Sequence, residues 1–153
     1  MISPELVRRY AFFGGLTPDE AACIALCADE VHWPDGTIVF RDGDPATHVF
    51  VVMSGMVDMV HHVNIDSRTE AVEVGSTAPG EPFAISAFVA PYRLTATAQC
   101  RGAVKAIRVD AEALRALSET NCHLGYTIMR QIARALSERL SYCRIQLAAC
   151  RPG

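Results

Sequence analysis

Residues 38–55 read IVFRDGDPATHVFVVMSG, and this stretch decides the fold class. Residues 38–40 and 48–53 are rich in β-branched and aromatic side chains, which favour strands. Residues 41–45 and 54–55 consist mainly of Gly, Pro, Asp and Ser, which favour turns. The stretch therefore predicts short strands separated by tight turns, and no helix.

The alternation of strand-like runs and turns continues as far as residue 109. Further β-type runs lie at residues 56–60, 70–74, 95–98 and 104–109. Many short strands at near-regular spacing are typical of a β-sandwich or jelly roll, whereas βαβ units need helical segments between their strands. We therefore expect a β-roll, a jelly-roll-like double-stranded β-helix, over residues 32–109.

Helix signals flank this middle segment on both sides. Ser3-Pro4 and the capping box that begins at Thr17 predict two short helices within residues 4–28. Asp110, and then Thr120 or Asn121, can cap two helices in a tail over residues 110–150. The sequence thus predicts one α+β domain over residues 1–153, a β-roll between N-terminal helices and a long C-terminal helix.

The long helix of the tail carries an apolar seam. Its members recur at steps of three and four residues: Met129, Ile132, Leu136, Leu140, Cys143, Leu147 and Cys150. Such a seam is longer than one small core needs. We expect its first half to pack on the roll of the same chain and its second half to pair with another copy, giving a homodimer.

Composition excludes several functional classes. Half of the 153 residues are apolar and the net charge is −3, which suits one domain with a buried core and disfavours disorder. The chain has 14 Lys and Arg against 17 Asp and Glu and contains no basic run, so nucleic-acid binding is disfavoured. No stretch approaches the roughly 20 apolar residues of a membrane span, and no secretory signal is present. We expect a cytoplasmic protein with no membrane contact.

The six cysteines are scattered along the chain. They lack the grouping that zinc or iron–sulfur sites need, and the chain is not a small loop-rich secreted scaffold. We interpret them as small buried apolar residues and predict no metal site. These residues are Cys23, Cys27, Cys100, Cys122, Cys143 and Cys150.

Several short motifs, taken in order, resemble the cyclic nucleotide-binding domain family, and in particular the effector domain of catabolite activator proteins. The resemblance covers residues 5 to 145. The motifs are FFGGL (12–16), IVFRDGD (38–44), residues 49–55, GEPF (80–83), PYR (91–93), ATA (96–98) and LSERL (136–140). Each motif alone is weak, but their order and spacing together are specific.

The resemblance implies an eight-stranded β-roll that binds a cyclic nucleotide such as cAMP in a phosphate-binding cassette. A short helix of the cassette offers N–H groups to the phosphate, an arginine neutralises it and a glutamate accepts from the ribose. By position, Arg93 is the phosphate arginine. The predicted ligand-binding residues are Phe83, Ala84, Ile85, Ser86, Ala87, Tyr92, Arg93, Leu94 and Thr95.

This cassette departs from the family pattern at three positions. Ile85 stands where the carboxylate is expected, Ala84 replaces a glycine, and Leu94 follows the arginine where small or hydroxyl residues are usual. Glu81 lies twelve residues before Arg93 and is interpreted as a loop residue. The departures predict a weakened or altered ligand specificity. A degenerate domain that binds another small anion, or only a protein partner, stays open as the alternative.

An enzyme is the less favoured interpretation. A related jelly roll, the cupin, holds a metal with histidines two residues apart, whereas His61 and His62 are adjacent and would point to opposite faces of a strand. No nucleophile motif is present. We therefore predict a non-catalytic, stand-alone regulatory domain without a cofactor other than its ligand. Because the chain ends about three residues after the predicted helix, we expect no DNA binding by this chain alone.

Overall fold

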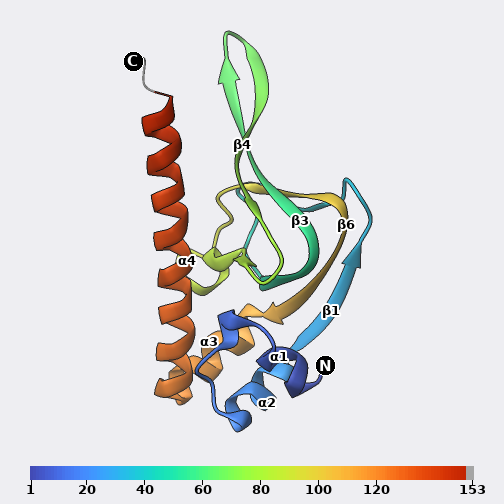
Figure 1. Cartoon of the computed structure of the whole chain (residues 1–153), viewed down its shortest axis with the longest axis vertical. Coiled ribbons are helices and arrows are strands. Elements are labelled where there is room, and N and C mark those ends of the chain that lie inside the picture. Colours follow the sequence, from blue (N-terminus) through green and yellow to red (C-terminus); the bar gives the residue numbers. More distant parts are fainter. Residues whose placement is uncertain (151–153) are drawn as a thin grey trace.

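The computed structural model describes residues 1–150, so the last three residues of the expected domain lie outside the described part. An antiparallel sheet is rolled on itself, with short helices at one end and one long helix along its side (Figure 1). The predicted α+β class, a β-roll flanked by N-terminal helices and a long C-terminal helix, is confirmed. Among the described residues, no helix combines the length and apolar character needed to cross a membrane.

Two helices and a 3-10 turn precede the sheet: α1 (Pro4–Arg8), η1 (Ala11–Phe13) and α2 (Pro18–Leu26). Ser3 caps α1 by accepting from the Leu6 N–H. The predicted capping box of α2 is present, because the Glu20 N–H donates to Thr17 Oγ1 (3.2 Å) and the Thr17 N–H donates to Glu20 Oε1 (2.9 Å). α2 ends at Leu26, two residues before the predicted end of the helical segment.

Glu20 also joins α2 to the start of the long helix. Its buried carboxylate lies 2.8 Å from Nδ1 of His123. Burial alone would raise the pKa of Glu20, but hydrogen bonds from the Thr17 N–H, His123 and Asn121 hold it below its usual value.

Six strands form the sheet, in the order β1-β6-β3-β4, with β2 paired to β6 and β5 paired to β3. Their bounds are β1 (Ala28–Trp33), β2 (Ile38–Phe40), β3 (His48–Ile65), β4 (Arg68–Thr77), β5 (Pro82–Phe83) and β6 (Thr97–Asp110). β1 is a correction, since the sequence placed Ala28 in a helix and began the roll at residue 32. It pairs with β6 from Ala28↔Val109 to Trp33↔Val104.

Two strands are longer than predicted, and residues 1–150 form six strands where the resemblance implied eight. β3 continues through Gly55, and β6 joins the two predicted runs at 95–98 and 104–109. Residues 54–55 form an irregularity in the β3–β6 pairing and not a turn. Gly55 has φ +87°, and a Cβ there would overlap the carbonyl oxygen of Ala103. Only glycine therefore lets β3 pass this close to β6.

The far end of β3 and the start of β4 form a hairpin that extends beyond the roll, at the same end as the last turns of the long helix (Figure 1). Asp66 and Ser67 at its tip both have positive φ, which suits the twist of a two-residue hairpin turn. Cross-strand pairing places His61 opposite Val72.

Two helices follow the sheet in the described part of the chain: α3 (Ala111–Thr120) and α4 (Cys122–Ala149). Asp110 accepts from the Ala113 N–H (2.8 Å) and Asn121 from the Leu124 N–H (3.1 Å), so both predicted caps are present. The buried residues of α4 end at Ile132, and the rest of the helix extends past the core. The first half of α4 therefore packs on its own domain, as predicted.

Candidate ligand-binding site

A cavity of about 680 Å³ lies between the rolled sheet and the second half of α4. Its walls come from β3, β4, the segment before β5, the segment before β6 and α4. Apolar side chains dominate: Met56, Met59, Val74, Pro82, Ala96 and Tyr142. The polar side chains that line it include His61, Ser76, Thr77, Glu81, Thr95 and Arg139.

The predicted cassette runs beside this cavity, from β5 through the 3-10 helix η2 (Ile85–Phe88) to residue 95. Most of its predicted ligand-binding residues belong to the core. Ser86 is half-buried, whereas Phe83, Ala84, Ile85, Ala87 and Leu94 are buried. Phe83 stacks on Phe50 with ring centroids 4.8 Å apart.

The position where the family has its carboxylate is therefore a core position here. Ile85 is 5% exposed and does not line the cavity. Ala84 before it has φ +58°, a left-handed conformation that costs a residue with a Cβ about 1–2 kcal/mol relative to glycine. Ala84 thus adopts a left-handed conformation at the position where the resemblance implies a glycine.

Tyr92 and Arg93 lie on the outer side of the cassette. Arg93 is exposed, and its guanidinium donates to the carbonyl oxygen of Gly43 (3.1 Å) without lining the cavity. The Tyr92 ring lies under the guanidinium of Arg115, at 4.1 Å, and Arg115 also donates to the carbonyl of Ala87. Arg115 of α3 therefore contacts the cassette at two points.

Of the nine predicted site residues, Thr95 lines the cavity. The ligand role of all nine stays a prediction. Three charged residues that the sequence left outside the site, Glu81, Glu138 and Arg139, do line it. From the sequence alone, Glu81 is interpreted as a loop residue, and Arg139 is included only within the LSERL motif. No local sequence pattern marks Arg139, because its partners lie more than 50 positions away in the sequence.

Arg139 bridges α4 and the sheet. Its guanidinium donates to the carbonyl oxygen of Pro82 (2.7 Å). Burial lowers the pKa of Arg139, while the negative charge of Glu81 acts in the opposite direction. The Glu81 carboxylate accepts from the Ala78 N–H (3.3 Å), which keeps it at the wall of the cavity.

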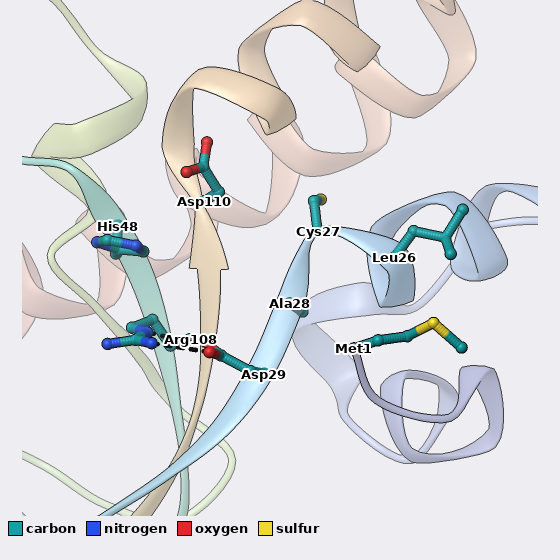
Figure 2. Close-up of a pocket in the computed structure, with 8 residues that line it drawn as sticks. All are labelled: Met1, Leu26, Cys27, Ala28, Asp29, His48, Arg108 and Asp110. Atoms are coloured by element: carbon teal, nitrogen blue, oxygen red, sulfur yellow. Dashed lines mark hydrogen bonds and ion pairs between the residues drawn. The ribbon is translucent and has the colours of Figure 1, made fainter.

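A second, smaller hollow of about 270 Å³ lies where β1 follows α2. Figure 2 shows Asp29 and Arg108 facing each other across β1 and β6, with His48 nearby on β3 and Met1 on the opposite side. Asp29 and Arg108 form an ion pair of 2.7 Å, and their hydrogen bond lowers the pKa of Asp29. These charged groups satisfy each other, so we assign this hollow no ligand.

The interpretation of the cysteines as buried apolar residues holds for Cys100 and is wrong for four others. Cys27 is half-buried, and Cys23, Cys122, Cys143 and Cys150 are exposed; of these, Cys143 lines the cavity. Within residues 1–150, no group of three His, Cys, Asp or Glu side chains is placed to hold a metal ion.

Comparison with known proteins supports the assignment of this fold. A cyclic nucleotide-binding protein family model, "Cyclic nucleotide-binding domain", matches residues 30–121. The CRP-like cAMP-activated global transcriptional regulator of Mycobacterium tuberculosis is 25% identical over 132 residues, which are 86% of this chain and 58% of that protein. The chain thus spans less than two thirds of the length of this relative.

Solved structures agree. A candidate cyclic nucleotide-binding protein from Geobacter metallireducens GS-15 is 32% identical, with a TM-score of 0.79 over 92% of this chain and 99% of that one. The c-di-GMP responsive global regulator of Xanthomonas campestris shares the fold at 21% identity, with a TM-score of 0.71 over 86% of this chain and 63% of that one. The chain belongs to the cyclic nucleotide-binding domain family.

Proposed function

We propose that this chain is a non-catalytic sensory domain that binds a cyclic nucleotide or a similar small anion between its β-roll and α4. The observation that carries the proposal is the cavity of about 680 Å³, which falls within the range of roughly 300–1,000 Å³ typical of small-molecule sites. Its apolar walls with a few polar groups at defined positions are also typical of such sites.

The position of the cavity suits a regulatory role. One wall belongs to the sheet and the other to the part of α4 that lies beyond the core, so an occupant contacts both. Thr95 and Ala96 connect the cavity to the cassette, and Arg115 fastens the cassette to α3. A ligand that prefers one placement of α4 would shift the population toward it.

The choice of ligand follows from the relatives and from the departures in the cassette. The mycobacterial relative is cAMP-activated, which makes cAMP the first candidate. The regulator from Xanthomonas campestris responds to c-di-GMP, which makes this dinucleotide the second. The core position of Ile85 and the left-handed Ala84 support an altered specificity.

We also propose a homodimer through α4. The seam residues beyond Ile132 are exposed, as are further apolar residues on this half of the helix. Leu136, Leu140 and Leu147 recur at steps of four and seven and form one exposed row, whereas Tyr142 lines the cavity and Ile145 lies on another face of the helix. A row of this kind on one helix is typical of an interface with another chain.

Calorimetric titration with cAMP, cGMP and c-di-GMP tests the ligand proposal. We expect saturable binding of at least one of them at one site per chain. Ala135→Trp is the matched control, because Ala135 faces the cavity from α4 and an indole there would fill it. Binding that survives this substitution would place the site elsewhere. No binding of any nucleotide would favour the second candidate, a domain of this fold that binds a protein partner through the exposed face of α4.

A further inference from the structure

The cavity contains one cationic side chain that forms no ion pair among residues 1–150, although Glu81 lies close enough to influence its pKa. His61 and Arg139 are the basic residues that line it. His61 lies 3.4 Å from Asp42, whereas within residues 1–150 Arg139 forms no ion pair and donates instead to the neutral carbonyl of Pro82. A guanidinium has five N–H donors in a planar fork, so several of them remain for a ligand.

The other arginines near the cavity are already engaged. Arg101 forms a pair of 2.6 Å with Asp58. Arg93 donates to Gly43 on the outer side of the cassette and does not line the cavity. Arg139 is partly buried, where its attraction for an anion is screened less than at an exposed site.

The other side chains that line the cavity favour a ligand that is mainly apolar. Met56, Met59, Val74 and Ala96 from the sheet face Tyr142 from α4 across the cavity. Contact with these side chains is best made by a flat ring system, which removes apolar surface from water on both of its faces.

We infer that Arg139, carried by α4, binds the acidic group of the ligand in place of Arg93, and that the cavity selects ring-containing molecules with one acidic group. The inference rests on the proposed function and names the ligand class of the same cavity. A carboxylate, a sulfonate or a phosphodiester would satisfy the same fork of N–H donors. The negative Glu81 beside Arg139 would disfavour a second acidic group at that position.

Two fluorescent dyes with the same rings test this inference. The dye 8-anilino-1-naphthalenesulfonate carries one sulfonate, and N-phenyl-1-naphthylamine is its uncharged counterpart. For the unmodified protein we expect tighter binding of the sulfonate dye, and loss of both dyes in Ala135→Trp. Arg139→Gln should weaken the sulfonate dye by about ten- to a hundred-fold, the range for loss of a charge-assisted hydrogen bond, and change the uncharged dye by less than about twofold.

Three further variants separate the charge of Arg139 from its structural contact with Pro82. Arg139→Lys keeps the charge and should keep most of the preference for the sulfonate dye. Arg134→Gln, on the exposed side of the same helix, should change neither dye. Arg93→Gln is the rival variant, and it should also leave both dyes bound.

The outcomes distinguish this inference from the proposed function. If Arg139→Gln weakens binding of both dyes equally, Arg139 only holds α4 in place. If Arg93→Gln selectively weakens binding of the sulfonate dye, the anion binds to the cassette and not to Arg139. Either result, or no preference for the sulfonate in the unmodified protein, overturns the inference but leaves a ligand site in the cavity. Dye binding that is insensitive to Ala135→Trp and to added cAMP would overturn the proposed function itself.

Discussion

Replacing Ile85 with glutamate restores the residue type that the family's cassette uses, and the structure predicts that this chain does not tolerate it. Ile85 is 5% exposed, at the start of η2. Removing its burial costs about 1.5–3 kcal/mol, and burying a carboxyl group without a partner adds about 1–3 kcal/mol. We therefore expect Ile85→Glu to lose about 3–6 kcal/mol, a large share of the roughly 5–15 kcal/mol typical of a domain.

The assay is thermal and urea unfolding of the ligand-free protein, with Val89→Glu as the matched control. Val89 ends the same 3-10 helix but is 44% exposed, so its substitution should cost no more than about 0.5 kcal/mol. For a chain of this length the two variants should differ in Tm by about 6–20 °C.

The pH dependence of Ile85→Glu provides a second readout. Burial raises the pKa of the introduced carboxyl group, so the folded state binds its proton more tightly than the unfolded state. The stability of this variant should therefore fall as pH rises, and the deficit should shrink between about pH 7 and about pH 5. Similar losses in Ile85→Glu and Val89→Glu would refute the core assignment of residue 85. So would a gain in affinity for cAMP over 2′-deoxy-cAMP, because it would place the carboxylate beside the ligand.

Three further predictions concern the framework of the site. The pKa of Glu20 is lowered in the folded state, so the free energy of unfolding should fall as pH falls from about 5 to about 3. Glu20→Gln should make this loss smaller. Equal losses in the variant and the unmodified protein would contradict the prediction. Gly55→Ala should lower the free energy of unfolding by about 2–5 kcal/mol, because alanine is strained in the left-handed backbone conformation and its Cβ would overlap the backbone of Ala103. Gly36→Ala, at φ +80° with open space around it, should lower it by only about 1–2 kcal/mol. Equal losses in urea unfolding would exclude the overlap. Replacing Leu140 and Leu147 with glutamate should shift light scattering from dimer to monomer, and a monomeric unmodified protein at micromolar concentration would end the dimer proposal.

The features that could be predicted from the sequence are those determined by short-range chemistry. Ser3, Thr17, Asp110 and Asn121 all cap the helices expected of them, because a capping side chain acts on an N–H group two or three residues away. The strand-rich middle was equally local, since β-branched and aromatic runs between Gly and Asp turns favour pairing. The spacing of these runs predicted the roll, and the caps with the apolar seam predicted the long helix.

The features that were missed depend on partners far along the chain. β1 contains Asp29 and Glu30, which are poor strand residues in isolation, and it forms because β6 pairs with it across about 75 positions of sequence. Gly55 suggested a turn, but β6 on the other side of it keeps β3 continuous. Arg139 belongs to the same class, since its contact with Pro82 exists only once α4 lies against the sheet.

The arrangement of α4 explains how one helix can serve both proposals. Ala135, Arg139 and Tyr142 recur at steps of four and three and line the cavity, while Leu136 and Leu140, one residue further on, form a neighbouring exposed row. Among residues 133–150 none is buried in the domain's own core, and the bond from Arg139 to Pro82 links this half of the helix to the sheet. A ligand whose acidic group binds Arg139 would alter the hydrogen bond to Pro82 and rotate this half of α4, which moves the cavity-lining row and the exposed row together. We therefore expect ligand binding and pairing of two chains to be coupled through the orientation of α4, so that the strength of the dimer depends on whether the cavity is occupied.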